Sequence, residues 1–146
     1  MKSLLWTVAR MARAEISLLD PLDARWAAFV ESIPQANIFH HPAWANLLAE
    51  CYGYRSFIIA LIDENETICA GLPVLEVSSA LTGRRWTSLP FTDYCQPLYH
   101  DRNAFESLTL GLVDLFQHKN PPVLKFVGNY QHAHPSKVFP IMFITL

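Results

Sequence analysis

Several common sequence signatures are missing, and each absence narrows the classes of protein that this chain can belong to. The 146 residues carry a net charge of −2, so the chain lacks the basic excess that neutralises nucleic-acid phosphates, and we expect no DNA partner. No apolar stretch approaches the roughly 20 residues that a membrane-spanning helix needs. The composition, 51% hydrophobic and 16% charged, indicates a folded domain with a sizeable core.

Cysteine is also scarce: the three are Cys51, Cys69 and Cys95. Their number is odd, their spacing is wide, and no CxxC pair occurs. The sequence therefore suggests neither a zinc ribbon nor a thioredoxin-type site. Three free thiols are typical of a reducing compartment, so we expect a cytoplasmic protein.

The pattern of residues 1–13 predicts an N-terminal leader. Lys2 precedes a short apolar run, which Arg10 and Arg13 close. The run is too short for a signal peptide and has no small-residue cleavage site. It is either a frayed end or a basic amphipathic segment that touches an anionic membrane surface as a peripheral contact.

The hydrophobic patterns in residues 14–129 predict one domain with a mixed sheet flanked by helices. We expect strands at 14–19, 57–62, 67–77, 84–89 and 123–127, and helices at 20–33, 42–52 and 103–119. This order, β-α-α-β-β-β-α-β, places consecutive hairpin strands between helices. The fold class is therefore α/β of the α+β type and differs from a doubly wound parallel sheet.

Local signals predict where the helices begin and end. Asp20, ahead of a proline, is expected to cap the first helix. His41 should cap the second helix, and Gly53 should end it. Asn103 and Glu106 form a capping pair for the third helix.

Two further regions depart from a regular pattern. Gly71 and Pro73 fall inside the strand at 67–77 and predict a bulge or a locally unpaired edge there. Residues 130–146 form a tail of uncertain structure, polar and His-rich at first and apolar at the end. A core strand in this tail would need a partner that we do not find in the sequence.

Two segments resemble Fem-type acyltransferases (FemAB-like proteins) of the GNAT superfamily. Residues 37–44, NIFHHPAW, resemble the Phe-His…Trp entry of these proteins. Residues 81–95, LTGRRWTSLPFTDYC, resemble their LPF-S/T-D-x-C segment. The resemblance covers residues 14–129, and it implies a GNAT-like fold.

The resemblance also implies an activity: transfer of an acyl or aminoacyl group to an amine of a peptidoglycan or exopolysaccharide precursor. The acceptor would be a small molecule or a lipid-linked envelope precursor, reached from the cytoplasm at the inner membrane face. The donor of the full-length family would be acyl-CoA or aminoacyl-tRNA. Family members are more than twice as long and have two GNAT-like halves, so we expect a truncated chain that docks to a missing C-terminal half.

The donor site is expected to lie outside this chain. A GNAT acyl-CoA site needs a glycine-rich turn that presents backbone N–H groups at a helix start. The corresponding segment here, residues 90–102, contains no glycine. Pro90 and Pro97 lack an N–H group, and Asp93 and Asp101 would repel phosphate. We therefore assign no cofactor-binding residues.

Arg85, Trp86, Asp93 and Tyr94 are the candidates for contacts with the acceptor. The guanidinium group of Arg84 or Arg85 suits a carboxylate or phosphate, although both could form a solvated strand edge. Asp93 is the one candidate for catalysis, as a base or as a group that orients the amine, and otherwise a turn residue. Trp86 and Tyr94 either line a cleft or belong to the core.

Other chemistries have weaker support in the sequence. The histidine pairs at 40–41 and at 132 and 134 invite a metal site, but no acidic or cysteine partner lies at tight spacing, so we assign no metal ligands. Cys95 and His100 could form a nucleophile and a base, yet nothing orients the histidine.

Two alternative functions remain open. The chain could be a non-catalytic interaction module or the inactive remnant of a truncated gene, and its abrupt apolar end at 141–146 favours these readings. It could instead be a complete single-domain acetyltransferase, which would require acyl-CoA binding by this chain.

Overall fold

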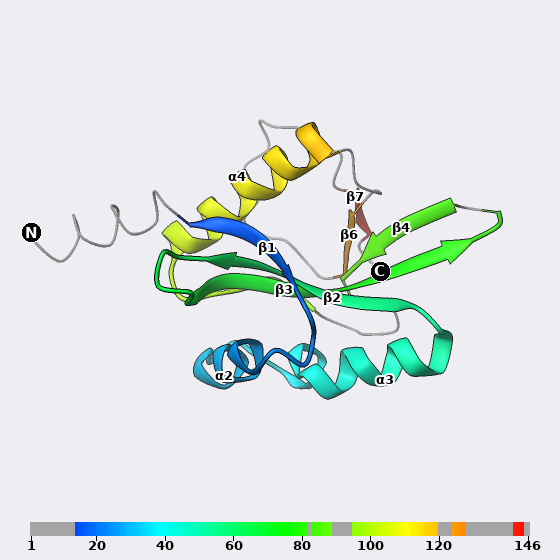
Figure 1. The fold of residues 1–146 in the computed structure, drawn as a ribbon, viewed down its shortest axis with the longest axis horizontal. Helices are drawn as coiled ribbons and strands as arrows, with labels where there is room; N and C mark the ends of the chain where they lie inside the picture. Colours follow the sequence, from blue (N-terminus) through cyan, green and yellow to red (C-terminus); the bar gives the residue numbers. More distant parts are fainter. Residues whose placement is uncertain (1–13, 82, 89–94, 120–123, 128–141, 145–146) are drawn as a thin grey trace, which may run out of the picture.

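A computed structural model describes residues 14–81, 83–88, 95–119, 124–127 and 142–144, which form a sheet with helices on both faces (Figure 1). Helices α2 and α3 cover one face, and α4 covers the other. The strands are β1 (Glu15–Leu19), β2 (Arg55–Ile62), β3 (Ile68–Ser79), β4 (Gly83–Thr87), β5 (Leu98–Tyr99), β6 (Leu124–Val127) and β7 (Met142–Ile144). The helices are α2 (Ala24–Ser32), the 3-10 helix η1 (Ile38–His40), α3 (Pro42–Tyr52) and α4 (Arg102–Lys119).

The sheet is mixed, as the sequence predicts. Its strand order is β1-β2-β3-β4-β6-β7, with β5 beside β3. The strands from β1 to β4 are antiparallel neighbours, whereas β6 is parallel to both β4 and β7. Helix α4 supplies the crossover that a parallel connection from β4 to β6 requires. Each segment predicted as a helix or strand contains one, and η1, β5 and β7 are additional.

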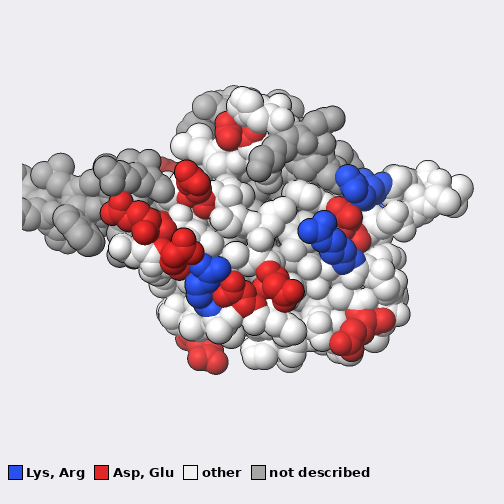
Figure 2. Space-filling model, viewed as in Figure 1, with Lys and Arg blue, Asp and Glu red and all other residues white. Residues whose placement is uncertain are grey.

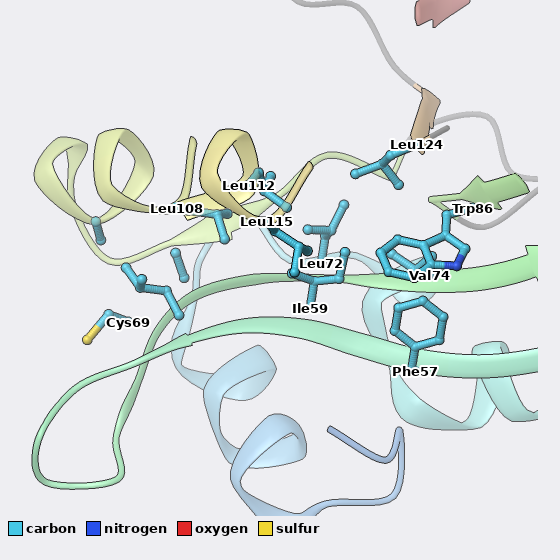
Figure 3. Packing of buried hydrophobic residues seen from close by; sticks show 13 residues of the cluster. Phe57, Ile59, Cys69, Leu72, Val74, Trp86, Leu108, Leu112, Leu115 and Leu124 are labelled. Carbon is cyan, nitrogen blue, oxygen red and sulfur yellow. The ribbon is translucent and has the colours of Figure 1, made fainter. Parts of the chain in front are cut away.

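Strand β2 is buried on both faces, which explains its continuous apolar sequence. Its side chains alternate between two clusters: Phe57, Ile59 and Leu61 pack with α4, while Ile58, Ala60 and Ile62 pack with α2. Figure 3 shows Phe57 and Ile59 in the α4 cluster, below Leu108, Leu112 and Leu115. The two layers of helices are therefore positioned by one hairpin, β2–β3.

The cap of helix α2 lies three residues later than predicted. Its cap is Asp23, whose side chain accepts a hydrogen bond from the backbone N–H of Arg25 at 2.9 Å. Asp20 instead accepts from the N–H of Leu22 at 2.8 Å, within the turn that precedes the helix. Both aspartates can make such local bonds, so the sequence alone selected the wrong one.

The predicted cap of α4 is also wrong, whereas both predicted ends of α3 are confirmed. Asp101 caps α4 by accepting a hydrogen bond from the N–H of Ala104 at 2.9 Å. Asn103 lies inside the helix, and Glu106 pairs with Arg102 on its surface.

In α3, the imidazole of His41 accepts from the N–H of Ala43 at 3.2 Å. Gly53 then ends the helix in the left-handed region, with φ of 67°. A proline at the first helical position and a glycine after the last are strong signals, which is why this helix was predicted accurately.

The irregularity in the β2–β3 hairpin lies away from Gly71 and Pro73. The register shifts between Leu61 and Ile62, near the turn, while Pro73 pairs regularly with Ile58. On its other side, β3 pairs with β5 at residues 70–71 and with β4 at residues 75–79. Pro73 therefore lies between the two described ladders, where its missing N–H is tolerated. This agrees with the predicted locally unpaired edge, whereas the alternative of a bulge at Gly71 or Pro73 is wrong.

Gly71 is required by packing. A Cβ atom at this position would lie 2.8 Å from the backbone oxygen of Ile59 and 3.1 Å from a ring carbon of Trp26. Trp26 is fully buried, so α2 can approach the sheet this closely only because β3 has no side chain here.

The end of the chain contains a strand that the sequence analysis did not predict. Strand β7 pairs with β6 in parallel, from Lys125 opposite Met142 to Val127 opposite Ile144. The partner thought to be missing is therefore the strand at 124–127. The predicted leader, residues 1–13, and the rest of the 130–146 tail lie outside the described residues.

We expect Gly71→Ala to lower the free energy of unfolding by about 1–3 kcal/mol, because the methyl group must displace the indole of Trp26 or the backbone of β2. Urea denaturation measures this loss. Gly53→Asn is the control, since its Cβ would meet nothing within 4 Å and asparagine tolerates a left-handed backbone. A loss no larger for Gly71→Ala than for this control would contradict the packing argument.

Candidate functional site

The LPFTDYC sequence lies in the chain between two short strands, β4 and β5. Strands β4 and β5 are both antiparallel to β3 and lie along the same side of it. Strand β4 ends at Thr87, and β5 begins at Leu98. The hydroxyl of Ser88 donates a hydrogen bond to the carbonyl of Cys95 at 3.2 Å, which joins the residues on either side of 89–94. Residues 89–94, including Asp93 and Tyr94, lie outside the described residues.

His40 connects this segment to the helices. Its side chain is fully buried, and its Nε2 lies 2.8 Å from the carbonyl oxygen of Gln96. Its Nδ1 accepts a hydrogen bond from the N–H of Asn37 at 3.1 Å. Its own carbonyl oxygen accepts from the indole N–H of Trp26 at 3.1 Å. One residue therefore links α2, η1 and the chain just before β5.

These contacts determine the protonation state of His40. Because the N–H of Asn37 points at Nδ1, that nitrogen must be unprotonated, and the ring proton is on Nε2. Burial disfavours the charged ring and lowers the pKa of His40, although the carbonyl of Gln96 acts in the opposite direction. The neutral imidazole is therefore part of the folded state, and both ring nitrogens are used within the protein, which leaves none for a metal.

Cys95 and His100 do not form an activated nucleophile. Cys95 is fully buried, which raises the pKa of its thiol to about 12, and its Sγ lies 4.0 Å from the carbonyl oxygen of Phe39. His100 packs edge-on against Phe29, with ring centroids 5.0 Å apart. A thiol buried among apolar groups is inert compared with the lowered-pKa thiols of catalytic sites.

Trp86 lies in the core cluster under α4 (Figure 3). Its side chain is 7% exposed and contacts the rings of Phe57 and Phe116 edge-on, at centroid distances of 4.9 and 6.3 Å. Its indole N–H donates to Glu76 at 2.8 Å. The described surface therefore presents little of Trp86 to an acceptor.

The two neighbouring arginines of β4 differ in surroundings. Arg84 is largely exposed, and its Nε lies 3.7 Å from the carboxylate of Glu76. Arg85, the residue predicted from the sequence, is partly buried and lies opposite Val77 on β3. It also makes an interaction within the protein. Because successive side chains of a strand point to opposite faces, the structure places Arg84 near Trp86 and Arg85 on the other face.

The start of α4 is unsuited to a phosphate. The carboxylate of Asp101 accepts the N–H of Ala104 and so occupies the position where an anion would meet the helix. A hollow nearby, lined by Ile33, Gln35, Gln96, Pro97, Leu98 and Tyr99, has a volume of about 10 Å³. This is room for about one water molecule.

The described part of the chain contains no group of three or more His, Cys, Asp or Glu side chains that could hold a metal ion. None of the described helices has the length and apolar content of a membrane-spanning segment. The predicted pair His132 and His134 lies outside the described residues.

Comparison of the sequence with protein-family models and with curated proteins found no match.

The stability of the protein should fall with acidification through His40. Its pKa is lowered in the folded state, so below the ordinary value of 6.5 the unfolded chain binds a proton that the folded chain does not. Stability is therefore fully present above pH 6.5 and is lost as the pH falls toward the folded-state pKa, with a slope of at most about 1.4 kcal/mol per pH unit. Urea denaturation between pH 7 and pH 5 measures this slope.

The variant His40→Gln tests the assignment because glutamine can still donate to Gln96 but cannot titrate. We expect a lower stability at pH 7 and a shallower dependence on pH. Gln117→Ala is the control, since Gln117 is exposed on α4 and the change removes no titratable group, so the slope should stay as in the wild type. A wild-type slope in His40→Gln would show that other groups cause the acid sensitivity.

The cysteines should differ in reactivity. Cys51 is exposed, whereas Cys69 and Cys95 are buried. With a pKa of about 12, only about one Cys95 thiol in 10,000 is ionised at pH 8. We expect iodoacetamide to label Cys51 in the folded protein, and all three thiols only after unfolding, as read by peptide mass spectrometry. Rapid labelling of Cys95 in the folded protein would instead support a nucleophilic role.

Proposed function

We propose that this chain is the acceptor-side half of a Fem-type acyltransferase that acylates an amine of a cell-envelope precursor. The observation that carries this proposal is how the residues on either side of 89–94 are held. Ser88, Cys95 and Gln96 take part in hydrogen bonds beside the central hairpin. The chain therefore enters and leaves the stretch that includes Asp93 and Tyr94 at fixed points of a rigid sheet, which is typical of binding segments.

The fold is compatible with a GNAT-like half. A mixed sheet with antiparallel strands β1 to β4, followed by a helix and a parallel strand, supports the resemblance that the two sequence segments suggest. The carboxylate of Asp101 occupies the start of α4, so an anionic donor would have to bind elsewhere. This supports a donor site in a second half. In this proposal the donor, acyl-CoA or aminoacyl-tRNA, binds to a second GNAT-like half, and this half contributes Asp93 and Tyr94 at the acceptor.

Asp93 is proposed to orient the acceptor amine or to take its proton, and Tyr94 to contact the acceptor. A carboxylate near an amine can accept the proton that the amine loses during acyl transfer. Arg85 and Trp86, also predicted from the sequence, have weaker support as direct contacts. Trp86 packs in the core, and Arg85 is partly buried and interacts within the protein. We place the reaction in the cytoplasm, at the inner membrane face when the acceptor is lipid-linked.

Calorimetric titration tests the proposal with two ligands. We expect a soluble peptidoglycan precursor to bind and coenzyme A to give no heat of binding. Asp93→Asn and Tyr94→Phe should each weaken precursor binding about tenfold, the range for loss of a hydrogen bond to a charged group. Asp114→Asn is the control, because Asp114 is exposed on α4 and pairs with His118.

Two results would reject the assignment. Tight, stoichiometric capture of coenzyme A would show that this chain holds the donor itself, as a complete single-domain acetyltransferase would. Equal binding of the precursor by the wild type, Asp93→Asn and Tyr94→Phe would remove the proposed loop from the acceptor site.

A non-catalytic interaction module is the second candidate. It is favoured by the structural use of the groups that could do chemistry: His40, Cys95 and Trp86 are all buried and packed or hydrogen-bonded within the domain. Absence of binding to either ligand by a chain that unfolds cooperatively would favour this candidate.

A further inference from the structure

A polar cluster interrupts the apolar face of the sheet beyond the packed part of α4. Glu76 on β3 lies directly opposite Arg55 on β2 and directly opposite Trp86 on β4. Arg84, two residues before Trp86 on the same strand, occupies the diagonal position. All four side chains therefore project from one face. Figure 2 shows two groups of basic atoms on either side of acidic atoms at the end of the sheet where β3 and β4 meet.

The carboxylate of Glu76 is held by the tryptophan more closely than by either arginine. Its Oε2 accepts from the indole N–H of Trp86 at 2.8 Å, while the Nε of Arg84 is 3.7 Å away. Glu76 is mostly buried, with 15% of its side chain exposed, whereas Arg84 is 63% exposed. The contact with Arg84 is too long for a strong hydrogen bond, so the guanidinium retains donors that point to solvent.

Arg55 is also available to a ligand. Its guanidinium carbon lies 5.6 Å from the centroid of the Phe57 ring, over the ring face, and its side chain is exposed. Stacking on an aromatic ring orients the guanidinium without using its N–H groups. Two guanidiniums beside one carboxylate leave an excess of positive charge at this place on a protein whose net charge is −2.

We propose that Arg55 and Arg84 form a binding site for a phosphate group above Glu76. Guanidinium groups bind phosphate through paired N–H donors, and Arg55 on β2 and Arg84 on β4, on either side of β3, can approach one phosphate from two sides. Glu76 orients Arg84 and limits affinity, because its charge opposes the ligand. The phosphate could belong to a soluble molecule or to a lipid headgroup. Its assignment to the acceptor rests on the proposed transferase function, whereas the binding itself does not.

Isothermal titration with inorganic pyrophosphate at low ionic strength tests the site. We expect the double variant Arg55→Gln/Arg84→Gln to bind at least tenfold more weakly than the wild type. The control Arg25→Gln/Arg102→Gln also removes two positive charges, at positions where Arg25 pairs with Asp23 and Arg102 pairs with Glu106, and should change the affinity less than twofold. If the Arg55→Gln/Arg84→Gln variant and the control lose the same affinity for pyrophosphate, the loss reflects only the net charge of the protein, and the proposal is overturned.

Glu76→Gln gives a second test with the opposite sign. Glutamine can still accept the indole N–H of Trp86, yet it removes the negative charge beneath the ligand. We expect pyrophosphate to bind several-fold more tightly than to the wild type. An unchanged or weaker affinity, in a variant whose thermal unfolding resembles that of the wild type, would contradict the site.

Vesicle sedimentation distinguishes the two sources of phosphate. Binding to phosphatidylglycerol vesicles that exceeds binding to phosphatidylcholine vesicles and is lost in the double variant assigns the site to a lipid headgroup. Pyrophosphate binding without vesicle binding assigns it to a soluble phosphate. If the protein binds neither pyrophosphate nor the vesicles, the proposed phosphate site is wrong. The transferase proposal is then decided separately, by the precursor titrations of Asp93→Asn and Tyr94→Phe.

Discussion

Burial of the β2–β3 hairpin on both faces is the constraint on which the rest of this structure depends. Strand β2 has apolar side chains in every position from Phe57 to Ile62, so neither face of it can be left to water. Helices α2 and α3 must therefore cover one side and α4 the other. Close approach on the α2 side requires Gly71, because the ring of Trp26 lies where a side chain of β3 would be.

A second constraint is the neutral imidazole of His40. A buried polar side chain destabilises a protein unless its hydrogen bonds are satisfied. Here Asn37 and Gln96 satisfy both ring nitrogens, and the residue's carbonyl oxygen satisfies the indole of Trp26. The result is a connection between α2, η1 and the chain before β5. It connects Gln96, next to the end of the LPFTDYC sequence, to the helical layer. One end of the proposed acceptor segment is therefore held by a residue to which we assign no chemical step.

The two proposals rest on different parts of the structure. Gln96, which follows Asp93 and Tyr94 in the chain, is hydrogen-bonded near η1 and β5, whereas the arginine cluster lies on the α4 face of the sheet, around Glu76. From the sequence, Arg85 is predicted as an acceptor contact because a guanidinium group suits a carboxylate or phosphate. The register shows that Arg84 projects from the same face as Trp86, together with Arg55 from another strand. That Arg55 lies opposite Glu76, 21 residues further along the chain, could not be read from the sequence, because a contact at this separation leaves no local pattern.

The sequence by itself determined the class of fold, the positions of the predicted helices and strands, and the ends of α3. These depend on local properties: apolar periodicity, a proline at a helix start and a glycine at a helix end. Only the tertiary structure decided which aspartates cap α2 and α4, that position 71 must be glycine, and that β7 pairs with β6. It also decided that His40, Cys95 and Trp86 serve the fold. Each of these outcomes depends on which distant groups compete for the same hydrogen bond or the same space, and that competition exists only once the chain is folded.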